Sequence, residues 1–232
     1  MAGTGPGDVD LLILGAGWTS AFLIPLLKKA DISYAATTTT GRDGTYKFKF
    51  EYDDSSEVSL EDDPEQYAAL PNAKTILITF PLKGKNQSKH LVTSYIKNHS
   101  SEKSSYQFIQ LGSSGIFTIE NQSLWVTRHS NYNKTNPRAI AEDELLELGG
   151  SVLNLSGLWG GERQPKNWID RVAATKDQLK GKTSLHLVHG QDVARGIIAV
   201  HRKFDSAKGQ RFVRRDVRLS SIYRRTNFVV RY

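Results

Sequence analysis

The stretch VDLLILGAGWTSAFLIPLLKK, residues 9–29, decides the fold of this 232-residue chain. Residues 9–14 form a short, mostly apolar run that stops at Gly15, which is typical of a buried strand. Residues 18–29 carry apolar side chains at helical spacing and predict a helix, although Pro25 predicts a kink within it. A strand, a glycine turn and a helix in direct succession indicate the first unit of an α/β protein.

The turn between this strand and helix predicts a dinucleotide site. Gly15 permits a tight turn, Gly17 lets the backbone approach a pyrophosphate, and the helix start offers free amide groups. Ser20 stands where a third glycine is usual, and it is still small enough for close packing. The alternative is an ordinary strand-to-helix turn that uses Gly-x-Gly without a ligand. The predicted cofactor-binding residues of the turn are Gly15, Ala16, Gly17, Trp18, Thr19 and Ser20.

The rest of the chain alternates strand and helix patterns. Strands are expected at residues 32–36, 45–52, 74–80, 106–111, 151–155 and 185–188, and helices at 62–70, 86–98, 137–148, 169–179 and 191–203. This order predicts a doubly wound parallel sheet of the Rossmann type, with a very small C-terminal substrate lobe. Residues 1–212 would form the NAD(P)-binding domain and residues 213–232 a basic tail of uncertain structure.

The residues after the second strand bear on the choice of cofactor. An NAD site usually has Asp or Glu about 20 residues beyond the glycines. Here the chain has four threonines, residues 37–40, followed by Gly41 and Arg42. The hydroxyl groups of Thr38 and Thr39 and the Arg42 guanidinium suit a 2′-phosphate, which favours NADP over NAD. In the alternative, Arg42 is an ordinary surface side chain and Asp43 binds the ribose of NAD.

Six stretches, in the same order, resemble the short-chain dehydrogenase/reductase superfamily. They are LGAGW (14–18), TFP (79–81), LGSSGIF (111–117), PRAIAEDELL (137–146), LSGLWGGER (155–163) and HGQDVARGI (189–197). The likeness covers residues 9–212 and is to the extended or atypical branch, which includes the NAD-dependent epimerase/dehydratase-like proteins. It implies that Thr79, Phe80 and Pro81 line the cofactor and that Leu158, Trp159, Gly160 and Arg163 line the substrate.

The chain departs from that family at the catalytic residues. The family uses a Ser or Thr together with a Tyr and a Lys four residues later, and no Tyr-x-x-x-Lys occurs here. Ser113 or Ser114 can supply the serine. Tyr132 could reach in from its loop with Lys134 or Arg138 as the cation, or it could be a loop aromatic. We therefore retain two hypotheses, an NADP-dependent oxidoreductase or epimerase-like enzyme acting on an unidentified small molecule, and an inactive NADP(H)-binding sensor or scaffold.

The amino-acid composition excludes several kinds of functional site and partner. The absence of cysteine excludes disulfides, thiolate metal sites and a cysteine nucleophile, and the six histidines show no metal-ligand spacing. Residues 202–232 contain ten basic and two acidic residues and so carry the whole excess of the +7 net charge. We interpret this segment as a solvated terminus rather than a nucleic-acid-binding one. Without a signal peptide or an apolar span, the expectation is a cytoplasmic protein without a membrane partner, while homo-oligomer formation stays open.

Overall fold

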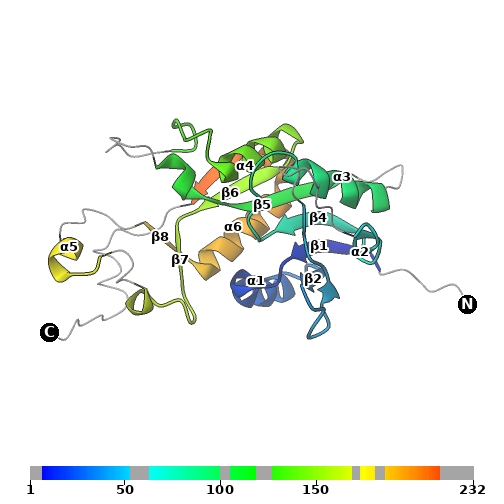
Figure 1. Ribbon diagram of the computed structural model, residues 1–232. Coiled ribbons are helices and arrows are strands. Elements are labelled where there is room, and N and C mark those ends of the chain that lie inside the picture. Colours follow the sequence, from blue (N-terminus) through cyan, green and yellow to red (C-terminus); the bar gives the residue numbers. More distant parts are fainter. Residues whose placement is uncertain are drawn as a thin grey trace, which may run out of the picture.

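The computed structural model describes residues 7–52, 63–99, 105–118, 127–168, 173–180 and 186–214. A seven-stranded sheet in the order β3-β2-β1-β4-β5-β6-β9 runs through these residues (Figure 1). The strands are β1 (Val9–Leu14), β2 (Tyr34–Thr38), β3 (Tyr46–Lys47), β4 (Ala73–Ile78), β5 (Gln107–Ser113), β6 (Ser151–Leu155) and β9 (Arg211–Arg214). Every pair of neighbouring strands is parallel. The predicted doubly wound parallel sheet is confirmed.

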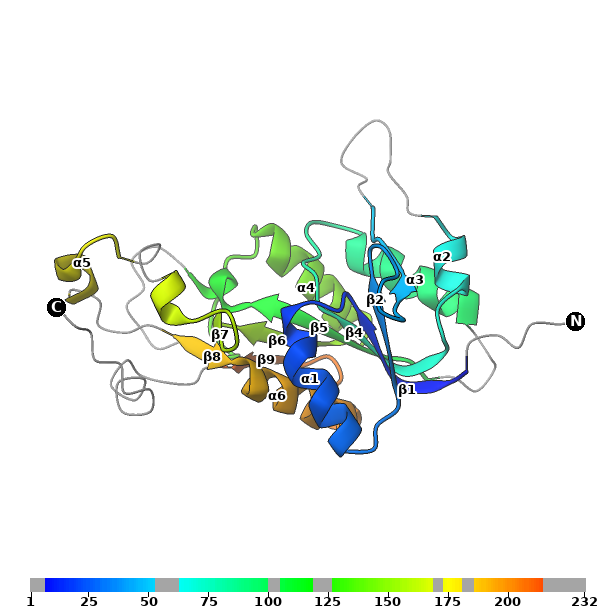
Figure 2. The ribbon, with the colours of Figure 1, turned by 90° about the horizontal axis from the view of Figure 1, so that it is seen from below.

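Helices cover both faces of the sheet. The longer helices are α1 (Trp18–Lys29), α3 (Gln87–His99), α4 (Pro137–Glu147) and α6 (Gly190–Arg202), and the shorter ones are α2 (Glu65–Ala68), α5 (Lys176–Lys180) and α7 (Phe204–Ala207). Figure 1 shows α3 and α4 above the sheet, and Figure 2, seen from below, brings α1 and α6 to the front. Because both faces are covered, the central strands β1, β4, β5 and β6 are buried on two sides, which explains the continuous apolar runs in the sequence.

The alternation along β1 divides the core into two halves. Leu11 and Ile13 belong to the cluster beneath α1 and α6, whereas Leu12 and Leu14 belong to the cluster beneath α3 and α4. All four side chains are completely buried. Burying one such side chain stabilises a fold by about 1.5–3 kcal/mol. β1 therefore anchors both halves of the core, and the turn that follows it is held on a rigid support.

Some predicted boundaries were wrong, for local reasons. The second strand is shifted from 32–36 to Tyr34–Thr38, because the Ile32 amide donates to Leu27 and completes the end of α1. The strand expected at 45–52 pairs with β2 only over Tyr46–Lys47. Of the helix expected at 169–179, residues 169–172 lie outside the described chain, 173–175 are not helical, and α5 covers Lys176–Lys180.

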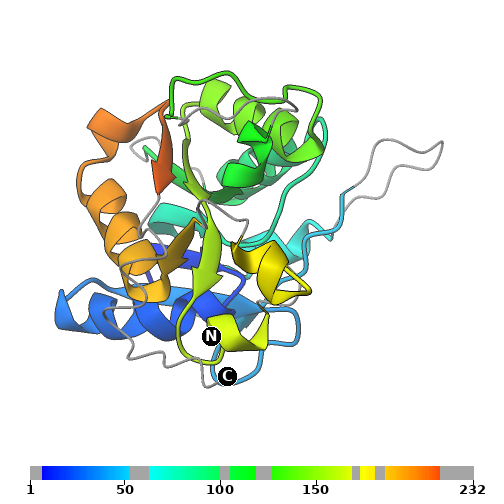
Figure 3. The same ribbon diagram turned by 90° about the vertical axis from the view of Figure 1, so that its left-hand side faces the viewer.

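The carboxyl edge of the sheet is where a ligand site is expected. The direction in which successive strands are added changes at β1, since β2 and β3 lie on one side of it and β4 and the later strands on the other. Ligands of doubly wound sheets bind at such a switch point. A second, two-stranded parallel sheet of β7 (Gly157–Trp159) and β8 (Leu187–His189) lies beyond this edge, as does α5; Figure 3 views the molecule from that side. These elements occupy the place of the small substrate lobe expected from the sequence.

β9 continues two residues past the predicted domain boundary. Val213 and Arg214 pair with Asn154 and Leu155 of β6, so residue 213 belongs to the sheet. The remainder of the predicted basic tail, residues 215–232, lies outside the described chain.

Candidate functional site

The turn after β1 is tied to its neighbouring strands by hydrogen bonds. Gly15 donates its amide to Thr37 Oγ1 at 2.9 Å, and Thr79 Oγ1 donates to the Gly15 carbonyl at 2.6 Å. Gly15 has a φ of 91°, and a Cβ atom there would lie 2.7 Å from Thr79 Oγ1. Only glycine fits this position, as the sequence predicts. Thr79, which the family resemblance places along the cofactor, therefore also holds the turn.

The start of α1 has the features of an anion site. Its N-cap, Gly17, provides no side-chain cap, and its first turn has no acidic residue. A Cβ atom at Gly17 would meet nothing within 4 Å, so the backbone is open to a ligand. Ser20 is only 5% exposed, and within the described chain its hydroxyl has no hydrogen-bond partner. Uncapped amides, an open approach and an unpaired hydroxyl fit the diphosphate of a dinucleotide.

The residues at the end of β2 are arranged differently from the sequence interpretation. Thr38 Oγ1 accepts from the amides of Gly41 at 2.9 Å and Arg42 at 3.2 Å, and it pairs with Thr45 Oγ1 at 2.8 Å. The Thr38 hydroxyl therefore holds its own turn. The Arg42 side chain is 71% exposed and lies 3.8 Å from Asp43. Solvent screening makes this contact weak, so Arg42 can turn toward a phosphate.

A pocket of about 590 Å³ extends from the glycine turn toward β3. Its lining includes Gly15, Thr39, Phe48, Phe50, Phe80 and Pro81. The rings of Phe50 and Phe80 are stacked with their centroids 5.6 Å apart. Phe48 and Phe50 were not predicted as site residues; the signal was the alternation of aromatic and charged side chains over residues 45–52, from which only a strand was predicted. The pocket joins four predicted cofactor residues to an aromatic wall.

At the end of β5, Ser113 is fixed by a buried polar network. Its amide donates to Glu142 Oε1 at 3.1 Å, and its carbonyl accepts from Asn154 Nδ2 at 3.0 Å. Its hydroxyl accepts from the Gly115 amide at 3.1 Å, so the O–H remains able to donate. Ser114 is the first residue of a 3-10 helix, Ser114–Phe117. Both predicted serines therefore lie at the carboxyl edge.

The network contains an ion pair that the sequence analysis did not identify. Arg211 on β9 donates to the Glu142 carboxylate and also to Asp143 Oδ1 at 2.6 Å. Glu142 is fully buried and Arg211 is 7% exposed. Burial raises the pKa of Glu142, while the bond from Asn154 and the charge of Arg211 oppose this shift. The interpretation of residues 202–232 as a solvated terminus is therefore wrong for Arg211.

Tyr132 is held in a different arrangement from that of an acid–base tyrosine. Its hydroxyl donates to Asp143 Oδ1 at 2.8 Å, and the Arg211 guanidinium lies 4.7 Å over its ring. Burial, with the hydrogen bond to Asp143, raises the pKa of Tyr132. A tyrosine that acts as an acid or base near neutral pH needs the opposite shift of its pKa. Arg138, a candidate cation, donates from Nη2 to the Leu111 carbonyl at 3.1 Å.

The predicted substrate loop contacts the glycine turn. Trp18 Nε1 donates to the Gly160 carbonyl at 3.1 Å, and the Arg163 guanidinium lies 4.7 Å over the Trp18 ring. The Trp159 and His189 rings meet edge to face at 4.7 Å. His189 Nδ1 accepts from the Gln191 amide at 3.2 Å, so this histidine is the N-cap of α6. Leu158 packs against the core beneath α1 and α6.

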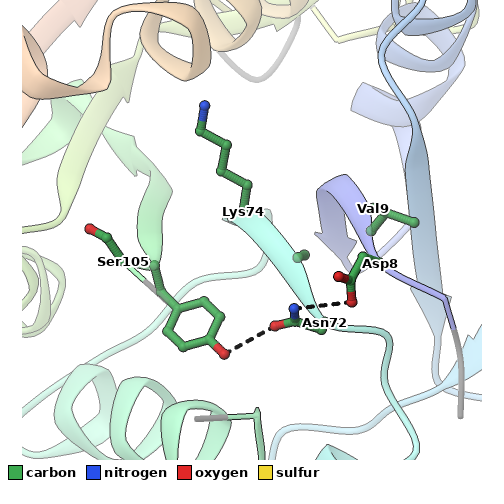
Figure 4. A pocket seen from close by; sticks show the side chains of 7 residues that line it. Asp8, Val9, Asn72, Lys74 and Ser105 are labelled. Carbon is green, nitrogen blue, oxygen red and sulfur yellow. Dashed lines mark hydrogen bonds between the residues drawn. The ribbon is translucent and has the colours of Figure 1, made fainter. Parts of the chain in front are cut away.

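A second pocket, of about 250 Å³, lies at the opposite, amino edge of the sheet (Figure 4). Asn72 Nδ2 donates to Asp8 Oδ1 at 3.1 Å, and the Tyr106 hydroxyl donates to Asn72 Oδ1 at 3.0 Å. Lys74 points away from the Asp8–Asn72 pair. Because these polar groups bind one another, we assign no ligand to this pocket.

The described residues contain neither a cluster of metal ligands nor a helix that could span a membrane. No group of three or more His, Cys, Asp or Glu residues in these ranges is arranged to hold a metal ion. Among the described helices, none has the length and apolar character needed to cross a bilayer.

Comparison with known proteins identifies the fold. No protein-family model and no curated protein sequence match the chain. Vestitone reductase from alfalfa (Medicago sativa) superimposes with a TM-score of 0.62 at 19% identity, covering 93% of this chain and 80% of the reductase. A short-chain dehydrogenase/reductase superfamily protein from Agrobacterium tumefaciens with bound NAD gives 0.66 at 11% identity, covering 94% and 83%.

A third neighbour is the RMD protein from Pseudomonas aeruginosa, which was crystallised with NADPH. It gives a TM-score of 0.57 at 13% identity, covering 89% of this chain and 77% of that protein. At such identities the likeness shows the fold alone. The expected resemblance to the extended short-chain dehydrogenase/reductase proteins is confirmed at that level.

Proposed function

We propose that this chain binds a nicotinamide dinucleotide across the carboxyl edge of its sheet. The observation that carries the proposal is the start of α1, where Gly17 leaves the amides uncapped and the Ser20 hydroxyl lies buried without a partner in the described chain. These groups would bind the diphosphate, because a helix N-terminus favours negative charge. The NAD and NADPH complexes among the structural neighbours support the same ligand class.

NADP is the preferred cofactor in this proposal. The pocket formed by Thr39, Phe48, Phe50, Phe80 and Pro81 would hold the adenosine end, with the stacked phenylalanine rings offering flat apolar surfaces. Arg42, which makes only an exposed contact with Asp43, would bind the 2′-phosphate. NAD stays the alternative if Asp43 binds the ribose hydroxyls instead.

The preferred activity is that of an NADP-dependent oxidoreductase or epimerase-like enzyme acting on a small molecule. A bound nicotinamide supplies hydride transfer. The protein would orient the substrate: the Ser113 hydroxyl is free to donate to a substrate oxygen, and Glu142 and Asn154 fix the backbone on either side of it. The loop carrying Leu158, Trp159, Gly160 and Arg163 would border the substrate space.

A catalytically inactive NADP(H) sensor or scaffold is the second candidate. The specific observation in its favour is Tyr132, whose hydroxyl is bonded to Asp143 and whose pKa is raised rather than lowered. The sequence contains no Tyr-x-x-x-Lys, so no other tyrosine can take the catalytic role in the usual pattern. Substituting Ser113 with alanine should abolish turnover in an enzyme and leave cofactor affinity unchanged in both cases.

The binding proposal is tested by calorimetric titration with NADPH and NADH, using Gly17→Asp as the diagnostic variant. An aspartate is a favourable N-cap, and a Cβ atom at position 17 meets nothing within 4 Å, so the fold should be kept or stabilised by a few tenths of a kcal/mol. Its carboxylate would repel a diphosphate and should weaken binding at least about 100-fold. Gly17→Ala is the control for size. Absence of saturable binding to the wild-type protein, or unchanged binding to Gly17→Asp, would contradict the proposal.

A further inference from the structure

Arg163 is held over the first residue of α1 by the shape of its loop. The amide of Gly160 donates to the Arg163 carbonyl and the amide of Arg163 donates to the Gly160 carbonyl, both at 3.1 Å, which makes a tight turn. Trp18 Nε1 donates to the Gly160 carbonyl, and the guanidinium lies 4.7 Å over the Trp18 ring. A cation over a tryptophan face is a favourable arrangement that also fixes the plane of the guanidinium.

The charges around Arg163 are unbalanced. Within residues 7–52, 63–99, 105–118, 127–168, 173–180 and 186–214, no carboxylate pairs with its guanidinium, although Glu162 is its neighbour in sequence. The first turn of α1 has no acidic residue either, and its amides are uncapped. A helix N-terminus carries about half a positive charge. Two positive groups therefore meet at the first residue of α1, the amides in the backbone and the guanidinium over the Trp18 ring, and an anion that reaches both would be stabilised.

The unpaired Ser20 hydroxyl is a second, independent sign of a ligand here. It lies in the first turn of the same helix, 5% exposed, and has no hydrogen-bond partner in the described part of the chain. A buried hydroxyl without a partner destabilises the fold, because its hydrogen bond to water is lost and not replaced. An oxyanion at the helix start would accept its hydrogen bond and those of the amides.

We propose that Arg163 binds the diphosphate of the dinucleotide from the side opposite the α1 amides. The inference rests on the proposed function and refines it. The family resemblance implies only that Arg163 lines the substrate, whereas here it binds the cofactor. The guanidinium can donate two hydrogen bonds to phosphate oxygens while it stays stacked on Trp18. Cofactor binding then fixes the loop of residues 157–163, and the substrate enters a site whose wall the cofactor has helped to position.

The test compares Arg163→Met, Arg163→Lys and the wild-type protein by calorimetry with NADPH and NADH at about 50 and 200 mM salt. Arg163 is exposed, and methionine keeps an apolar stem against Trp18, so the fold should persist. We expect Arg163→Met to weaken the binding of both dinucleotides about 10-fold or more and to lower the salt dependence of that binding. Arg163→Lys, which keeps the charge, should retain part of the lost affinity. Lys166→Met removes an exposed cation three residues further along the chain and should change neither the affinity nor its salt dependence.

A diphosphate-free ligand locates the effect. Adenosine 2′-monophosphate, measured by displacement of NADPH, should bind Arg163→Met as it binds the wild-type protein. If Arg163→Met binds both dinucleotides within two-fold of the wild type, the inference is wrong and the proposed function stands. If Arg163→Met weakens the binding of the mononucleotide as much as that of the dinucleotides, Arg163 does not act at the diphosphate. If the wild-type protein binds neither dinucleotide, the proposed function and the inference fail together.

Discussion

At the scale of single residues, Arg42 is the side chain on which the proposed choice of NADPH over NADH depends. Its guanidinium is 71% exposed and makes only a 3.8 Å contact with Asp43. We expect Arg42→Leu to weaken the binding of NADPH about 10-fold, because a hydrogen bond to a charged group contributes about 1.5–3 kcal/mol. NADH affinity should stay within two-fold, since NADH lacks the 2′-phosphate.

The measurement is the ratio of the two dissociation constants, determined by calorimetry. Lys28→Leu removes one exposed positive charge at the far end of α1 and should leave this ratio unchanged. An equal loss of both affinities in Arg42→Leu would indicate a general electrostatic effect. An unchanged ratio would favour Asp43 as the ribose ligand.

The residues that could be predicted from sequence are those whose role is set by their own backbone. Gly15 must be glycine because its φ is 91° and Thr79 lies close by, and a Gly-x-Gly pattern after an apolar run indicates this directly. The role of Thr38 could not be predicted, since its hydroxyl bonds to a turn that exists only once residues 41–45 have folded back. Arg211 was missed because its partners lie 68 and 69 residues earlier.

At the scale of elements, the network around Arg211 ties α4 to β9. Arg211 of β9 binds Glu142 and Asp143 of α4, and Asn154 of β6 donates to Glu142 at 2.7 Å. We expect Arg211→Met to lower the free energy of unfolding by about 3–5 kcal/mol, because it leaves a carboxylate buried without its cation. Glu142→Gln should offset part of that loss in the double variant, since the amide is neutral.

Urea denaturation of the single and double variants measures this coupling. Arg195→Met removes an exposed partner of Asp192 and should cost less than about 1 kcal/mol. Additive effects of Arg211→Met and Glu142→Gln would mean that the two side chains do not stabilise the sheet through one another.

Strand boundaries could be predicted where a local signal in the sequence ends the strand. β1 is set by its apolar run and by Gly15, and its bounds were predicted correctly. The aromatic alternation over residues 45–52 predicts a long strand, yet pairing stops after Lys47. The Phe48 amide donates a last hydrogen bond to the Thr38 carbonyl at 2.9 Å, and the buried Phe48 ring stacks toward Phe80 in the loop after β4. Alternation therefore reported which side chains are buried, but not whether a partner strand is present.

At the scale of the whole molecule, His201 links the α6 layer to the centre of the sheet and makes stability depend on pH. It lies on α6, is 8% exposed, and its Nδ1 is 2.8 Å from Thr75 Oγ1 of β4. Burial lowers the pKa of His201 below 6.5, and Lys74 adds to this shift while Asp10 opposes it. The folded protein therefore holds the neutral imidazole more strongly than the unfolded chain does.

The sign follows from proton uptake. Below pH 6.5 the unfolded chain binds a proton at this histidine and the folded protein does not, so stability is complete above pH 6.5 and falls as the pH is lowered toward the folded pKa. The slope from one proton is at most about 1.4 kcal/mol per pH unit. Burial raises the pKa of Glu142, which gives a slope of the opposite sign, and the lowered pKa of Asp10 acts only below about pH 3.8.

Comparison with His201→Asn isolates the histidine from these other groups. The asparagine amide can still pair with Thr75 but does not titrate, so the difference in unfolding free energy between wild type and variant should shrink as the pH falls from 7 to 5. Urea denaturation at each pH measures that difference. The substitution itself lowers the absolute stability, but only the change of the difference with pH is used. A difference that stays constant over this range would show that His201 titrates alike in both states. The packing of α6 against β4 would then contribute nothing to acid sensitivity.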